Sequence, residues 1–149
     1  MDRFLGKHSE LFYAALRVVA GFLFACHGAQ KLFGILGAQA ELSDPEGLAA
    51  GIIEFFGGSM IALGLLSSYA AFIASGEMAV AYFKAHAPRG LFPIMNGGEL
   101  AALFSWLFLF IAARGAGRYS LDALRVRPDR VRTITAQNSN WDTTQNHSR

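Results

Sequence analysis

Residues 11–36 read LFYAALRVVAGFLFACHGAQKLFGIL, and this stretch decides the fold. A helix rises about 1.5 Å per residue, so about 20 apolar residues cross a hydrocarbon core of about 30 Å. The stretch is longer than that, yet it holds Arg17, His27, Gln30 and Lys31. An Arg or Lys at the centre of a lipid-facing helix costs about 2.5–3.5 kcal/mol. These polar side chains are therefore expected to face other helices or to reach the membrane surface.

Three further apolar segments follow, and each is bounded by charges, prolines or short polar stretches. They cover residues 48–66, 69–83 and 97–113, and the first two carry Glu54 and Glu77. Short connections between helices are typical of antiparallel neighbours. The sequence therefore predicts an all-α protein, an integral membrane antiparallel four-helix bundle.

The composition agrees with a membrane protein. Hydrophobic residues make up 53% of the 149 residues, charged residues make up 16%, and the mean hydropathy is +0.33. Soluble core helices are the alternative, but segments 48–66 and 97–113 lack the charged outer stripe of an amphipathic surface helix. The single cysteine, Cys26, excludes an intramolecular disulfide and an all-cysteine metal site.

Charge at the ends of the segments predicts the orientation. Arg3 and Lys7 precede the first segment, and six arginines lie between residues 114 and 132, whereas the first loop is acidic. The positive-inside rule then places both termini in the cytoplasm, with Arg89 as an exception. Anionic lipid is a simpler partner for this basic stretch than nucleic acid. We expect a membrane domain over residues 1–132 and a disordered polar tail over residues 133–149.

Counting along antiparallel segments places several polar side chains at one depth in the outer half of the bundle. Lys31 and Glu54 share a level, and His27 lies one helical turn deeper, near the level of Glu77. The predicted polar cluster consists of His27, Gln30, Lys31, Glu54, Glu77 and Glu99. Two interpretations stay open for it: a functional pocket with His27 as a proton carrier, or an ion-pair network that only fixes helix register. Glu99 can also complete a capping box with Asn96.

Other positions carry structural predictions. Arg17 lies near the cytoplasmic end, where it either pairs with Asp122 or extends toward lipid phosphates. Small residues four apart, Gly21 with Ala25 and Gly58 with Ala62, favour close helix packing, as do Gly98 and Ala102.

The sequence contains no autonomous catalytic motif. Dinucleotide-binding, phosphate-binding, nucleophile-elbow and zinc-protease signatures do not occur in it. The Glu-x-x-His pattern of di-iron bundles is missing as well, so no metal site is predicted.

Short motifs in a fixed order resemble the DoxX family of small bacterial membrane proteins. They run from Leu16 to Leu124 and include residues 27–32 (HGAQKL), 63–65 (LGL), Glu77-Met78 and 115–122 (GAGRYSLD). The family often has proline where Ala116 stands here. The resemblance implies a four-helix protein of the bacterial cytoplasmic (inner) membrane. It also implies kinship with membrane subunits of quinone-linked oxidoreductases, such as thiosulfate:quinone oxidoreductase, but it supplies no catalytic residues.

With this resemblance, we expect an accessory or membrane-anchor subunit for redox chemistry, with the bilayer and a redox protein as partners and quinone as the cofactor to test. Two alternatives stay open. One is a small-solute or proton transporter or channel, for which a homo-oligomer is expected. The other is a structural or assembly protein without catalytic activity.

Overall fold

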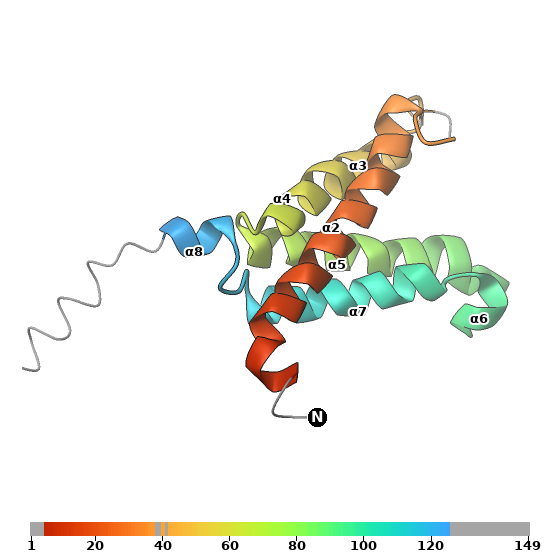
Figure 1. Ribbon diagram of the computed structural model, residues 1–149. Helices are drawn as coiled ribbons and strands as arrows, with labels where there is room; N and C mark the ends of the chain where they lie inside the picture. The colour runs from red at the N-terminus through yellow and green to blue at the C-terminus, as the bar shows by residue number, and fades with distance from the viewer. Residues whose placement is uncertain (1–4, 38–39, 41, 126–149) are drawn as a thin grey trace, which may run out of the picture.

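The computed structural model describes residues 5–37, 40 and 42–125. Every regular element in this part of the chain is helical, so the predicted all-α class is confirmed. The expected tail over residues 133–149 lies outside the described residues. The helices pack as two antiparallel pairs (Figure 1).

The first pair consists of α2 (Ser9–Phe33), which follows a short helical turn η1 (Gly6–His8), and a returning helix. The returning helix contains α3 (Pro45–Ile52), the π-helical segment η2 (Ile53–Gly57) and α4 (Gly58–Leu63). Asp44 starts it, because its carboxylate accepts hydrogen bonds from the backbone N–H groups of Glu46 and Gly47. Gly34 ends α2 in the left-handed conformation that glycine adopts without strain.

The second pair consists of α5 (Ser67–Ala81) and α7 (Glu99–Arg114), which lie side by side (Figure 1). The π-helical segment η3 (Tyr82–His86) extends α5, and η4 (Ala87–Arg89) and α6 (Pro93–Asn96) form the connection to α7. A short helix α8 (Leu121–Arg125) follows α7. Gly97 has a left-handed φ of 72°, so the last long helix begins at Glu99 rather than at the predicted Gly97.

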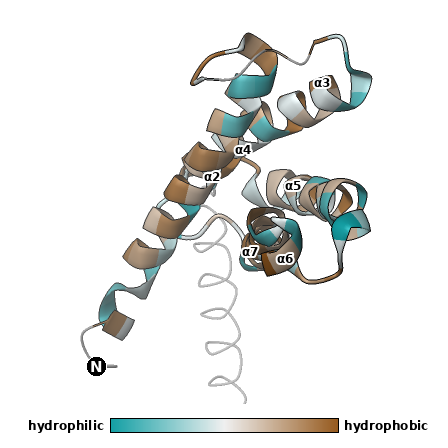
Figure 2. Cartoon of the chain, turned by 90° about the vertical axis from the view of Figure 1, so that its right-hand side faces the viewer, coloured by the Kyte–Doolittle hydropathy of each residue, from teal (hydrophilic) through white to brown (hydrophobic). Residues whose placement is uncertain are grey.

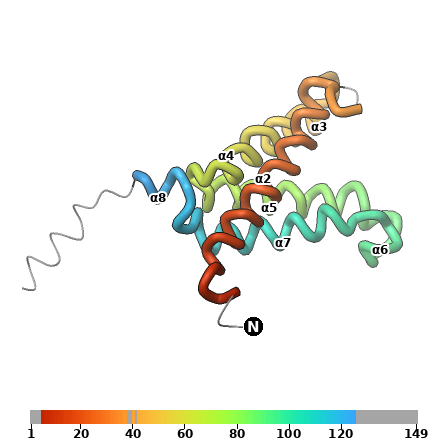
Figure 3. Tube along the Cα trace, viewed as in Figure 1, coloured from red at the N-terminus to blue at the C-terminus, as the bar shows by residue number. Residues whose placement is uncertain are grey.

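The two pairs cross at a steep angle instead of sharing one bundle axis. The tube in Figure 3 shows the crossing in the view of Figure 1, and Figure 2 shows it after a turn of 90°. Aromatic side chains meet at the crossing: the ring of Phe24 on α2 lies 5.8 Å from that of Phe104 and 4.7 Å from that of Phe108 on α7. The small core therefore sits where the pairs cross, and their far ends diverge.

Most of the outer surface is apolar. Phe22, Phe72 and Trp106 are 62%, 65% and 73% exposed, although each lies within a long helix. Within the described residues, two helical stretches are long and apolar enough to cross a membrane by length and composition: Gly6–Phe33 and Pro45–Leu63. Both belong to the first pair. An apolar exterior of this kind needs a non-aqueous or protein environment.

Close backbone contact holds the first pair together. A Cβ atom added to Gly21 would lie 2.5 Å from the backbone nitrogen of Ala62, and one added to Gly58 would lie 2.5 Å from that of Ala25. A Cβ on Gly28 would lie 2.7 Å from the carbonyl oxygen of Gly51. These glycines, 21, 28, 51 and 58, form a line that we call the glycine seam. The close packing predicted for Gly21, Ala25, Gly58 and Ala62 is confirmed.

A methyl group at Gly58 is therefore expected to force the two helices apart. We expect Gly58→Ala to lower the free energy of unfolding by about 1–3 kcal/mol, the usual cost of overpacking a filled contact. Gly57→Ala is the matched control, because a Cβ on Gly57 meets nothing within 4 Å. Thermal unfolding of both variants in detergent checks this. Equal melting temperatures for the two variants would contradict the seam.

Candidate functional site

The centre of the site is an ion pair between α2 and η2. The Nζ atom of Lys31 lies 2.9 Å from Oε1 of Glu54. The Glu54 side chain is 3% exposed and that of Lys31 is 28% exposed, so the pair is largely removed from solvent. The sequence placed these two residues at one depth, and the structure confirms that they meet.

The glycine seam explains why the pair forms. A Cβ on Gly51 would lie 3.1 Å from the Cβ of Lys31, so Lys31 passes directly over the backbone of the opposite helix. Glu54 follows Gly51 by three residues and lies on the π-helical segment η2. Single π-helical turns inside α-helices occur frequently at functional sites.

Glu77 brings a third charge to this place from α5. Its Oε2 atom is buried and has no hydrogen-bond partner. Glu77 lines the same cavity as Lys31, which pairs with Glu54, so the three ionisable side chains form one polar group. The Oε2 atom of Glu77 is therefore able to accept a hydrogen bond from a ligand.

A cavity of about 640 Å³ opens beside these side chains, between α3, α5 and η3. Lys31 and Glu77 line it, together with Glu46 near the start of α3 and Lys84 on η3. The Nζ atom of Lys84 lies 2.6 Å from Oε2 of Glu46, and both side chains are well exposed. This second ion pair therefore lies at the solvent-exposed rim of the cavity. Lys84 is not among the predicted site residues, although it ends the third apolar segment, at the level of the acidic first loop.

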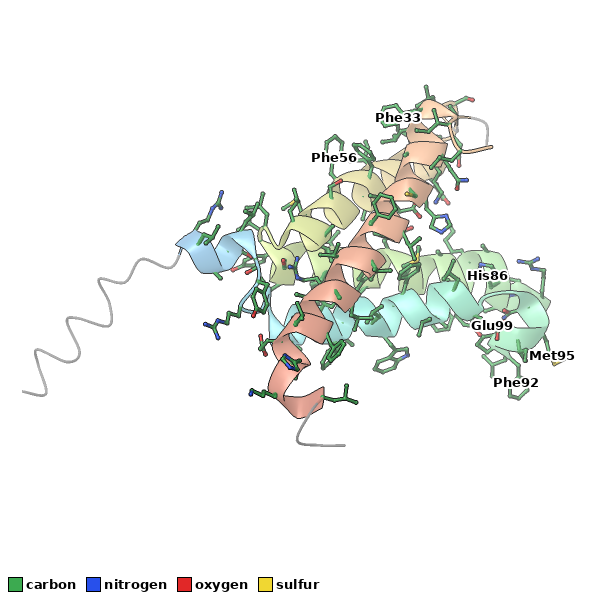
Figure 4. All side chains as sticks on the ribbon, viewed as in Figure 1. Phe33, Phe56, His86, Phe92, Met95 and Glu99 are labelled. Carbon is green, nitrogen blue, oxygen red and sulfur yellow. The ribbon has the colours of Figure 1, made fainter. Side chains whose placement is uncertain are left out.

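A second cavity, of about 390 Å³, continues the first along α5. The two share Ile53 and Ile73 in their linings, and the second is otherwise lined by aliphatic and aromatic side chains, Tyr69 among them, and by Gly57. Phe56, labelled in Figure 4, belongs to this apolar part and is 57% exposed. Together the cavities form an amphipathic groove between the first helix pair and α5, with a charged end and an apolar end.

The other members of the predicted cluster lie outside the groove lining. The amide nitrogen of Gln30 donates a hydrogen bond to the carbonyl oxygen of Leu36, 3.0 Å away, and so holds the end of α2. His27 is partly buried, and no hydrogen bond or ion pair joins it to Glu77. Glu99 is exposed near His86 and Met95 at the far end of α7 (Figure 4). Asn96 does not form the expected capping box with Glu99, because its Oδ1 atom accepts from the backbone N–H of Gly98.

Arg17 is buried at the opposite end of the first pair, with 1% exposure. Its guanidinium donates hydrogen bonds to the carbonyl oxygens of Ile61, of Ala62 at 2.8 Å and of Tyr119 at 2.7 Å. The expectation that Arg17 extends to lipid phosphates is therefore wrong. It binds carbonyls in the last turn of α4, where backbone carbonyls are incompletely paired within the helix.

Asp122 does not form the predicted direct ion pair with Arg17. Its two carboxylate oxygens accept hydrogen bonds from the backbone N–H groups of Leu66, at 2.9 Å, and Ser67, at 3.1 Å. Asp122 therefore caps the start of α5, while its own backbone N–H donates to the carbonyl of Gly64. We call this arrangement of Arg17, Tyr119 and Asp122 the polar clamp, because it ties the segment after α7 to the turn between the two pairs.

The part of the chain that is similar to known proteins includes most of this site. A model of the DoxX family matches residues 12–87, which include Lys31, Glu46, Glu54, Glu77 and Lys84. An uncharacterized protein from Haemophilus influenzae is 45% identical over 125 residues, which cover 79% of this chain and 93% of that protein. No solved structure matches this chain.

The buried ion pair gives a charge-reversal prediction. Lys31→Glu or Glu54→Lys alone is expected to cost about 3–5 kcal/mol, because each leaves two like charges in a poorly solvated place. The double variant is expected to recover most of that loss. Reversing Lys84 and Glu46 is the matched control, since an exposed pair contributes only about 0–1 kcal/mol. Unfolding in detergent measures all of these variants, and a double variant no more stable than either single one would contradict the pairing.

The capping role of Asp122 gives a second prediction. Asp122→Ala is expected to lower the free energy of unfolding by about 1 kcal/mol, because the N-terminal N–H groups of α5 lose their acceptors. Arg125→Ala, in the same short helix, is the control, since Arg125 is exposed. Identical melting temperatures for Asp122→Ala and the unmodified protein would contradict the capping role of Asp122.

Proposed function

This chain belongs to the DoxX family, and from that premise we propose that it is an accessory or membrane-anchor subunit of a quinone-linked oxidoreductase system in the bacterial cytoplasmic membrane. The observation that carries the proposal is the amphipathic groove, with Glu77 at its charged end. A membrane quinone likewise has a polar end and an apolar end, because its polar ring is joined to an apolar chain. Ligand sites of this type are mostly apolar, with a few polar groups that fix the orientation.

The residues present fit such a group. The buried Oε2 atom of Glu77 is an acceptor without a partner, and Lys31 lines the same cavity as a donor. In this proposal Lys31 and Glu77 hold the ring, while Ile53 and Phe56 line the place of the chain. When bound, the quinone would supply electron transfer coupled to proton uptake or release.

The chain's own part is to hold charge and move a proton. Glu54 accepts a hydrogen bond from Lys31 at 2.9 Å and so holds the Lys31 ammonium group in place. Glu77 gives or takes the proton at its carboxyl group. His27 lies one helical turn from Lys31 on α2, and its role as a further proton carrier stays a prediction.

We further propose that both helix pairs cross the bilayer, with both termini in the cytoplasm and the charged end of the groove in the outer half. Membrane helices tilt by up to about 40°. Two pairs that cross can therefore both span the membrane when they tilt in opposite directions. The apolar exterior of α5 and α7 supports this arrangement, since Phe72 and Trp106 are 65% and 73% exposed.

A small-solute or proton transporter is the second candidate function. The observation that favours it is the exposed Lys84–Glu46 pair at the rim of a charged cavity, which gives the interior a route to water. A purely structural or assembly role would leave the Lys31–Glu54 pair as a device that fixes helix register. Flux across proteoliposomes distinguishes transport from the proposed function.

Binding of quinone tests the proposal directly. Protein isolated from its membranes in mild detergent is expected to retain quinone that mass spectrometry of the lipid extract detects. Glu77→Gln removes a charged hydrogen-bond partner, a contribution of about 1.5–3 kcal/mol, so affinity should fall about 10-fold to 100-fold.

Glu46→Gln is the matched control, because Glu46 lies at the exposed rim and its loss should leave quinone retention unchanged. The same preparation shows whether a redox protein co-purifies. Absence of quinone from the unmodified protein, or equal retention by Glu77→Gln, would contradict the proposal.

A further inference from the structure

The connection between η4 and α7 exposes an unusual apolar group. Leu91, Phe92, Ile94 and Met95 are 71%, 66%, 77% and 80% exposed. Figure 4 shows Phe92 and Met95 at the far end of the second helix pair, pointing away from the helices. We call residues 91–95 the apolar tip. It lies outside the linings of the amphipathic groove.

Hydrogen bonds hold the apolar tip in this exposed form. Asn96 is 4% exposed; its amide nitrogen donates to the carbonyl of Gly90 at 2.6 Å, and its Oδ1 atom accepts from Gly98 at 2.7 Å. The hydroxyl of Tyr82 donates to the carbonyl of Leu91. The backbone on both sides of the tip is therefore fixed to η3 and α7. Since the tip is braced from within, its apolar side chains are displayed outward.

A cation lies next to the apolar tip. The Arg89 guanidinium donates to the carbonyl of Ala85 at 3.0 Å and lies 3.2 Å from Nδ1 of His86. No carboxylate pairs with Arg89 among the described residues, whereas nearby Lys84 is engaged by Glu46. An exposed cation beside large apolar side chains matches the boundary of a lipid layer, where anionic phosphates lie above acyl chains.

We propose that the apolar tip is an interfacial anchor, in which Phe92, Ile94 and Met95 enter the acyl region of the outer leaflet and Arg89 binds lipid phosphate. The inference rests on the proposed membrane location. Insertion into the acyl region removes these large apolar side chains from water. The free energy of insertion is favourable in proportion to the apolar surface area that is buried. It also accounts for Arg89 as the exception to the positive-inside pattern, because this arginine serves lipid contact at the outer surface.

Tryptophan fluorescence in vesicles tests the anchor. Phe92→Trp is placed in a chain with Trp106→Phe and Trp141→Phe, and the protein is reconstituted into phosphatidylcholine vesicles brominated near the headgroup end of the acyl chains. We expect strong loss of Phe92→Trp emission in brominated vesicles and little loss with aqueous acrylamide. Met95→Trp, at an 80% exposed position, should behave in the same way.

Trp106 in a Trp141→Phe chain reports the membrane location separately, because Trp106 lies on α7 and is 73% exposed. If brominated lipid quenches Trp106 but acrylamide alone quenches Phe92→Trp, the anchor is overturned while the membrane location stands. If brominated lipid quenches neither, both proposals fail. Protection of Phe92→Trp from both quenchers would mean that a protein surface covers the tip, which also overturns the anchor.

Discussion

Contact between helix backbones along the glycine seam is the constraint on which the rest of the structure depends. Gly21 and Gly58 leave no room for a methyl group, so α2 and α3–α4 pack in a single register. Membrane helices gain little from the hydrophobic effect against each other and depend on such close packing. The register in turn brings Lys31 to Glu54. An ion pair that is largely withdrawn from solvent is stable only with good geometry, which the seam supplies.

The polar clamp determines how the second helix pair leaves the first. Arg17 binds the end of α4 and the carbonyl of Tyr119, and Asp122 caps the start of α5. Both pairs are thus joined at one end, and Phe24 packs against Phe108 where they cross. Because the pairs diverge beyond the crossing, the amphipathic groove opens at the other end, beside the Lys31–Glu54 pair.

Local sequence patterns were sufficient to predict the helices and part of the site. Long apolar segments predicted the all-α class, and small residues four apart predicted close helix packing at Gly21 and at Gly58. Counting of depth predicted the Lys31–Glu54 pair. These features depend on neighbours along one or two helices, so a single sequence carries them.

The remaining features depend on the packing of distant segments. The crossing of the pairs follows from the contact of Phe24 with α7, more than 70 residues away in sequence. Backbone carbonyls, which no side-chain pattern reveals, took the place of Asp122 as partners of Arg17. The π-helical turns in η2 and η3 change which residues face the groove, and sequence periodicity assumes regular helix. Glu99 lies apart from the charges with which depth alone had grouped it, because it starts α7 at the end of the second pair that diverges from the first.

The central claim is that the groove between the first helix pair and α5 is the ligand site of this DoxX protein. Photolabelling with an azido-ring quinone in native membranes, followed by peptide mapping, tests it most directly. Label is expected within residues 45–53 and 73–85, which contain most of the residues that line the charged end of the groove. Label restricted to the outer face of α7 around Trp106, or no label that excess unmodified quinone can displace, would contradict it.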